Sequence, residues 1–154
     1  MLVISGPTAV GKTKLSLSLA QAIGGEIVSA DSAQVYRGMD IGTAKPTPEE
    51  RALIAHHLID VCDVTTPFNV AEFFKLAQNA FKEIHTRENV PIVVGGSGFY
   101  IHSLLYGPPH GPPSDLEVRL QLEKQMQDLG PEVLYERLQM LDPEYAATIS
   151  EHDR

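Results

Sequence analysis

Residues 6–13 read Gly6-Pro7-Thr8-Ala9-Val10-Gly11-Lys12-Thr13, and they match the pattern G-x-x-x-x-G-K-[ST]. The residues just before it, Leu2-Val3-Ile4, are typical of a short buried strand. After it come Leu15, Leu19 and Ile23, which are spaced four apart as on one face of a helix. This order of strand, loop and helix favours a phosphate-binding loop over a chance glycine-rich turn.

The chemistry of such a loop assigns a role to each part of the stretch. Glycines let the backbone wrap an anion without a Cβ clash, and the backbone N–H groups and the helix N-terminus then point at phosphate oxygens. Lys12 would reach a phosphate as a point charge, and the hydroxyl of Thr13 would be a ligand of Mg²⁺. We therefore expect the loop to bind phosphate through Gly6, Pro7, Thr8, Ala9, Val10, Gly11, Lys12 and Thr13.

Length, composition and charge limit the class of protein. The chain has 154 residues, of which 43% are hydrophobic, enough for one packed core with a small appendage. It contains no apolar run of the ~20 residues that a bilayer-spanning helix needs. Cys62 is the only cysteine and no signal peptide precedes the first strand, so we expect a cytoplasmic protein. The net charge of −8 argues against broad, non-specific nucleic-acid binding.

Apolar strands alternate with helical patterns beyond the first helix. The predicted elements are a strand over 26–30, a loop over 36–48, a helix beginning at Pro48, a strand over 57–61, a helix over 70–88, a strand over 91–94 and a helix over 99–105. This alternation predicts an α/β fold: a P-loop NTPase-like parallel sheet flanked by helices. Ligands of such sheets bind beyond the carboxyl ends of the strands, where the phosphate loop, Asp31-Ser32 and Gly95–Gly98 should meet.

The composition changes after residue 106. Residues 107–113 are rich in proline and glycine and are predicted to form a stiff linker between an α/β core over 1–106 and a helical insert subdomain over 114–154. Ser114-Asp115-Leu116-Glu117 is a capping-box pattern that predicts the start of a helix ending at Gly130-Pro131. A second helix should end at Asp142, where a third short one begins.

Three polar residues outside the phosphate loop are candidates for the chemistry. Asp31, at the carboxyl end of its strand, could help to hold Mg²⁺, act as a general base, or cap a turn. Ser97 could donate a hydrogen bond to a phosphate or a bridging oxygen, or be a simple turn residue. Arg119 could reach a phosphate or lie solvated on the surface, and the residues alone do not decide between these alternatives.

Several longer stretches resemble the tRNA dimethylallyltransferases, also called tRNA isopentenyltransferases. The first is Asp31-Ser32-Ala33-Gln34-Val35-Tyr36-Arg37-Gly38-Met39-Asp40-Ile41-Gly42-Thr43-Ala44-Lys45-Pro46. The others are His56–Asp60, Val93–Ile101 and Asp115–Arg119, so the resemblance covers nearly the whole chain. Members of this family are longer than 154 residues, and the resemblance implies that this chain is an N-terminal portion whose core continues beyond Arg154.

The resemblance implies an activity and a partner. It is the Mg²⁺-assisted transfer of a dimethylallyl group from dimethylallyl diphosphate to N6 of the adenosine 3′ of the anticodon in tRNA, by a monomeric enzyme. Under the same resemblance Asp31 is the general base, and Ser97, which stands where relatives usually carry Thr, is a second catalytic residue. The residues implied to contact tRNA are Asp31, Ser32, Ala33, Gln34, Ser97 and Arg119.

Other functions remain open from the sequence. A P-loop kinase that binds ATP and phosphorylates a nucleotide or a small metabolite shares the loop and the aspartate after the second strand, although no lid arginines are obvious. An enzyme that prenylates free adenine nucleotides and a module that only binds diphosphate are further alternatives.

Overall fold

The computed structural model describes residues 1–108 and 115–152. The chain divides into two compact units, Met1–Pro109 and His110–Arg154, and each is described by itself. The linker predicted over 107–113 falls mostly outside the described residues, since residues 109–114 are not described. The predicted domain boundaries therefore stay predictions.

The first unit contains a sheet of four parallel strands in the order β1-β4-β2-β3. The strands are β1 (Leu2–Ser5), β2 (Gly25–Ala30), β3 (His56–His57) and β4 (Val90–Gly95). At the carboxyl edge Gly95 pairs with both Ser5 and Ala30, so three strands end in register. The segments that follow β1, β2 and β4 consequently start side by side. The predicted parallel α/β fold is confirmed.

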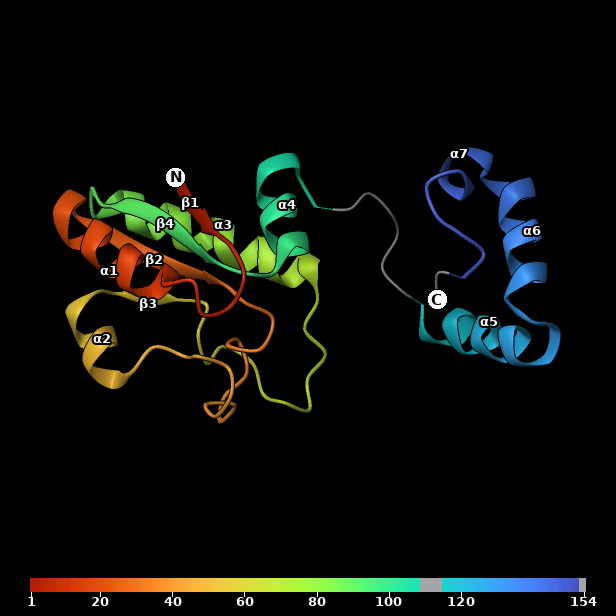
Figure 1. Cartoon of the computed structure of the whole chain (residues 1–154), viewed down its shortest axis with the longest axis horizontal. Helices are drawn as coiled ribbons and strands as arrows, with labels where there is room; N and C mark the ends of the chain where they lie inside the picture. Colours follow the sequence, from red (N-terminus) through yellow and green to blue (C-terminus); the bar gives the residue numbers. More distant parts are fainter. Residues whose placement is uncertain (109–114, 153–154) are drawn as a thin grey trace. The chain divides into compact units, whose positions relative to one another are not determined.

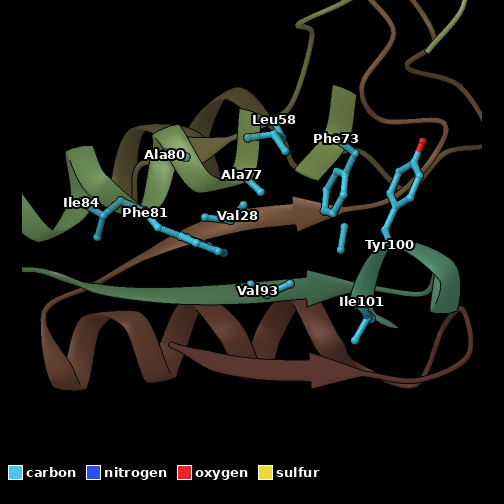
Figure 2. Close-up of a cluster of buried hydrophobic side chains, with 11 residues drawn as sticks. Val28, Leu58, Phe73, Ala77, Ala80, Phe81, Ile84, Val93, Tyr100 and Ile101 are labelled. Atoms are coloured by element: carbon cyan, nitrogen blue, oxygen red, sulfur yellow. The ribbon is translucent and has the colours of Figure 1, made fainter. Parts of the chain in front are cut away.

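Two helices cover opposite faces of this sheet (Figures 1 and 2). They are α1 (Lys12–Ile23) and α3 (Val70–Thr86). Val28 and Val93 belong to the core cluster under α3, whereas their neighbours Ile27 and Ile92 pack on the α1 side with Ala20. Side chains alternate between the two faces of a strand, so strands covered on both sides are apolar throughout.

The apolar stripe of α1 is not the face that the sheet buries most deeply. Leu15 and Ile23 are 57% and 39% exposed, and the fully buried residues of the helix are Ser16 and Ala20. Small side chains at these positions let the helix backbone approach the sheet closely. A spacing of four residues identified the helix, but it did not identify which stripe faces the sheet.

The long helix α3 forms as the sequence predicts. The Asn69 side chain caps it by accepting hydrogen bonds from the backbone N–H groups of Ala71 and Glu72. Its buried residues are Phe73, Ala77, Ala80, Phe81 and Ile84. Phe73 stacks on Tyr100 (Figure 2), and their ring centroids are 4.2 Å apart. Tyr100 belongs to α4 (Gly98–Tyr106), so the stack joins α3 to the helix that follows β4.

The predicted third strand over 57–61 is mostly absent. β3 has two residues, because Leu58 and Asp60 have positive φ values of 62° and 57° that turn the chain out of the sheet. The N–H groups of Val61 and Cys62 instead donate to the carbonyl of Val35. The predicted helix α2 (Pro48–Leu53) precedes this strand.

The second unit is helical, as predicted. It contains α5 (Leu116–Leu129), α6 (Pro131–Leu141) and α7 (Pro143–Ala146). α6 packs against both α5 and α7, and the Tyr135 hydroxyl donates to the carbonyl of Ala146 at 3.1 Å. No helix within residues 1–108 or 115–152 is long and apolar enough to cross a membrane.

Candidate active site

A cavity of about 530 Å³ opens at the carboxyl edge of the sheet. Most of its lining comes from four segments of the first unit: the phosphate loop with the start of α1, the end of β2 with the residues after it, the loop over 42–46, and the end of β4. Glu50, His56 and Ile59 complete the lining. Thr8, Ala9, Gly11, Lys12, Thr13, Asp31, Ala33 and Gln34 are the predicted site residues on this lining. Gly6, Pro7, Val10, Ser32 and Ser97 are not on it.

The backbone of the phosphate loop has left-handed residues just before α1. Gly11 is the N-cap of α1 with a φ of 91°, a left-handed conformation that glycine adopts without strain. Ala9 also has a positive φ, 68°. No acidic residue lies in the first turn of α1, so the positive end of the helix dipole meets no carboxylate there. The loop and the helix N-terminus together favour an anion at this edge.

Lys12 supplies the positive charge of the loop. Its Nζ donates to the carbonyls of Gly6 and Pro7, at 2.8 and 2.6 Å. These two hydrogen bonds hold the ammonium group against the loop. If a phosphate bound here, its charged oxygens would replace the two neutral carbonyls as acceptors for the Lys12 ammonium group. Charged oxygens make stronger hydrogen bonds with an ammonium group than neutral carbonyls do.

Asp31 directly follows β2 and lines the cavity. Its Oδ1 accepts hydrogen bonds from the N–H groups of Ala33 and Gln34, at 2.8 and 3.2 Å. Among the described residues, nothing donates to its Oδ2. The turn-capping role that the sequence left open is therefore present, and it leaves one carboxylate oxygen available for chemistry.

Ser97 joins the turn after β4 to the residues after β2. Its N–H donates to the carbonyl of Ala30 at 3.2 Å, and its Oγ accepts from the N–H of Ser32 at 3.0 Å. The close approach requires glycine at position 95, because a Cβ there would lie 2.1 Å from the Ala30 carbonyl oxygen. The hydroxyl is an acceptor in its bond to Ser32, so its hydrogen remains available to a ligand.

The loop after β2 forms a wall of the cavity that the sequence analysis missed. Gly42, Thr43, Ala44 and Pro46 line the cavity, and Lys45, which is not on the lining, anchors the loop. The Nζ of Lys45 donates to the Tyr36 carbonyl and pairs with Asp40 and Asp60 at 2.6 and 2.7 Å. These contacts join Lys45 to residues up to 15 positions away in the sequence. No local sequence pattern predicts them.

The charges around Lys45 are mutually stabilised. Its side chain is only 5% exposed, and burial alone would lower its pKa, but the hydrogen bonds to Asp40 and Asp60 outweigh burial and raise the pKa. The hydrogen bond from Lys45 holds the pKa of Asp60 below its usual value, against the effect of burial, and Arg51 adds to this effect. The loop is therefore anchored by ionised groups at neutral pH.

His56 lies on the cavity, whereas Arg119 lies on the surface of the second unit. His56 lines the cavity, its Nδ1 lies 2.7 Å from the Ile54 carbonyl, and burial lowers the pKa of its ring, so it is neutral at pH 7. Sequence reasoning gave it no functional role. Arg119 belongs to the second unit, where it is exposed and pairs with Glu123 at 2.9 Å.

The parallel sheet, the glycine-containing loop after β1 and the helix that follows it define a P-loop NTPase-like protein. Comparison with known proteins narrows this class. Residues 34–154 match the family model described as IPP transferase. The chain belongs to this family, and the alternative of a nucleotide or metabolite kinase is not favoured.

Individual relatives agree with this assignment. The chain is 58% identical to the tRNA dimethylallyltransferase of Protochlamydia amoebophila and 54% identical to that of Chlamydia caviae, in each case over all 154 residues. It spans 45% of the length of each of these relatives.

Solved structures also resemble the chain. The tRNA isopentenylpyrophosphate transferase of Bacillus halodurans is 44% identical with a TM-score of 0.69, over 99% of this chain and 50% of that one. A eukaryotic dimethylallyltransferase, solved in crystallographic snapshots of its action on tRNA, is 33% identical with a TM-score of 0.82. The match covers 99% of this chain and 38% of that one.

Proposed function

We propose that the protein carrying this chain transfers a dimethylallyl group from dimethylallyl diphosphate to N6 of the adenosine 3′ of the anticodon in tRNA. One observation carries the proposal: the phosphate loop and Asp31 line the same cavity. This transfer requires two things of the protein: it must bind the leaving diphosphate, and it must accept a proton. The phosphate loop suits the first task and the carboxylate suits the second. Membership of the IPP transferase family supports the choice of substrates.

The donor would bind with its diphosphate on the phosphate loop. The bond between the allylic carbon and oxygen breaks, the electron pair leaves with diphosphate, and the carbon becomes cationic in character. Backbone N–H groups and the ammonium group of Lys12 would stabilise the negative charge that builds up on the departing oxygens. The residues of the loop proposed to act here are Gly6, Pro7, Thr8, Ala9, Val10, Gly11, Lys12 and Thr13.

Asp31 would act as the general base. The N6 amine of adenine is a weak nucleophile because its lone pair is delocalised into the ring, so its proton must leave as the new carbon–nitrogen bond forms. Oδ2 is the oxygen that would accept this proton, since Oδ1 is occupied by two backbone N–H groups. Positioned proton transfer of this kind typically contributes ~10²–10⁴-fold to a rate.

The donor atoms in the cavity are suited to Mg²⁺ bound together with a diphosphate. Thr13 lines the cavity, and Mg²⁺ bound with a phosphate substrate keeps several waters and phosphate oxygens among its ligands, so it needs few protein oxygens. A cluster of three or more acidic, histidine or cysteine side chains is not needed, and none is found in the described part of the chain. When bound, the ion neutralises charge on the diphosphate, and Thr13 would hold it.

The acceptor would lie against the residues that follow β2 and β4. We assign Asp31, Ser32, Ala33, Gln34 and Ser97 to the side facing the target adenosine. The link between Ser97 and Ser32 supports this grouping, because it joins the two segments. Arg119, on the helical unit, is proposed to contact the tRNA elsewhere. A monomeric state and a cytoplasmic location stay predictions.

The test is transfer by the full-length gene product. Radiolabelled dimethylallyl diphosphate and unmodified tRNA should give labelled tRNA and free diphosphate. Absence of label in tRNA, together with ATP-dependent phosphorylation of a small acceptor, would overturn the proposal in favour of a kinase. Label on AMP or ATP in place of tRNA would redirect it to free nucleotides, and diphosphate binding without turnover would leave only a binding module.

A further inference from the structure

Gln34 has an unusual set of partners for a residue at the edge of a cavity. Its Oε1 accepts a hydrogen bond from the Ser29 hydroxyl at 2.9 Å. Its Nε2 donates to the carbonyls of Thr43 and Ala44, at 3.0 and 3.1 Å. Both hydrogens of the amide group and one lone pair of its oxygen are therefore engaged within the protein.

The segment held by this amide is not stabilised by regular secondary structure. Gly42 and Ala44 both have positive φ values, 79° and 49°, and the neighbouring Ile41 is 99% exposed. A positive φ at alanine costs free energy that surrounding contacts must offset. The Gln34 amide supplies two of these contacts, its hydrogen bonds to the carbonyls of Thr43 and Ala44.

The same residue is tied to Asp31. The N–H of Gln34 donates to Asp31 Oδ1, and its carbonyl accepts from the N–H of Asp60. The side chain of Gln34 thus connects the Thr43-Ala44 wall to the turn that carries the proposed base. Asp31, Thr43 and Ala44 all line the same cavity.

We infer that Gln34 is a positioning residue, whose amide holds the Gly42–Ala44 segment in place beside Asp31. The inference rests on the proposed function, because it refines how the acceptor side of the cavity is built. The diphosphate side is formed by a different segment, the phosphate loop. Loss of the Gln34 amide should therefore affect use of the acceptor more than use of the donor.

The choice of substitutions follows from the hydrogen bonds. Gln34→Glu preserves size, but an ionised carboxylate cannot donate to the carbonyls of Thr43 and Ala44 and repels them. Gln34→Met preserves length and removes the donors. Gln21→Glu is the matched control, since Gln21 is exposed on α1. The substitution introduces the same charge away from the cavity.

Two measurements on the full-length protein test the inference. Hydrogen exchange of the ligand-free protein should be at least ~5-fold faster over residues 39–46 in both Gln34 variants, because hydrogen bonds worth about 1 kcal/mol each are lost. Steady-state kinetics should show a ~10-fold or larger rise in KM for tRNA, with KM for the donor within about 2-fold of wild type. Gln21→Glu should match wild type in both.

Each other outcome has a distinct meaning. Weaker tRNA use with unchanged exchange over 39–46 would overturn the inference in favour of direct contact between Gln34 and RNA. Unchanged exchange and unchanged kinetics would also overturn it. If the wild-type protein transfers no prenyl group, the proposed function fails, while the exchange measurement still decides whether Gln34 holds the loop.

Discussion

The Oγ of Ser97 accepts a hydrogen bond from the backbone N–H of Ser32 at 3.0 Å, although the two residues are 65 positions apart. This bond joins the turn after β4 to the turn that begins with Asp31. Because β2 and β4 end in register, with Ala30 paired to Gly95, the two turns start at the same level of the sheet. The parallel pairing thus brings the hydroxyl to the segment that carries the proposed base.

Replacement of Ser97 by alanine should slow prenyl transfer. The variant loses the acceptor for the Ser32 N–H and the hydroxyl hydrogen proposed to reach the ligand, and one such hydrogen bond is worth about 1 kcal/mol. We expect kcat/KM to fall about 10-fold. Ser97→Thr keeps the hydroxyl and should stay within a few-fold of wild type. Equal activity of the alanine variant would remove Ser97 from the proposed site.

Substitution of Asp31 by asparagine separates base chemistry from structure. The Asn Oδ1 can still accept from the N–H groups of Ala33 and Gln34, so the turn should persist. We expect diphosphate binding to be preserved and single-turnover transfer to slow by ~10²-fold or more. Loss of diphosphate binding with the transfer rate preserved would instead make Asp31 a residue that holds the metal.

Lys12→Ala should weaken use of the donor. The substitution removes the ammonium group that lies on the phosphate loop, and a hydrogen bond to a charged group is worth ~1.5–3 kcal/mol. We expect KM for dimethylallyl diphosphate to rise at least ~10-fold. Lys82→Ala, on the exposed side of α3, is the matched control and should behave as wild type. Unchanged donor kinetics in Lys12→Ala would contradict the assignment of the loop.

Local signals made much of the fold predictable from sequence. The phosphate loop is recognisable because its glycines, lysine and threonine occur in order between a strand and a helix. The helix starts at Pro48 and Val70 could be predicted, because the caps Thr47 and Asn69 bond to N–H groups only two or three residues away. The phosphate loop and Asp31 could be placed together because the carboxyl ends of parallel strands share one edge.

Long-range contacts and backbone conformation were the features that the sequence did not predict. The strand predicted over 57–61 is replaced by a two-residue strand, His56–His57, because Leu58 and Asp60 adopt positive φ. A positive φ is uncommon at leucine, so the sequence gives no reason to expect it there. The contacts of Gln34 with Thr43 and Ala44 depend on how the loop folds back, 9 and 10 positions along the chain. The cavity wall formed by Thr43 and Ala44 was therefore less predictable than the phosphate loop.

The buried carboxylate of Glu26, at the start of β2, should make the protein sensitive to acid. Arg87 donates to both of its oxygens at 2.8 Å, Asn89 donates to Oε1 at 2.8 Å, and His57 Nε2 lies 2.6 Å from Oε2. The hydrogen bonds from Arg87, against the effect of burial and helped by Asn89 and His57, lower the pKa of Glu26 from 4.5 to about 2.

A depressed carboxyl pKa stabilises the folded state above the pKa of the unfolded chain, near 4.5, and this stabilisation is lost as the pH falls toward about 2. The shift corresponds to about 3 kcal/mol of unfolding free energy at pH 7. Glu26→Gln should lower the unfolding free energy at pH 7 and flatten its decline between pH 4.5 and 2. Urea titrations across this range measure both effects, with the exposed Glu136→Gln as the control. An acid-side slope as steep in Glu26→Gln as in wild type would show that Glu26 does not carry the effect.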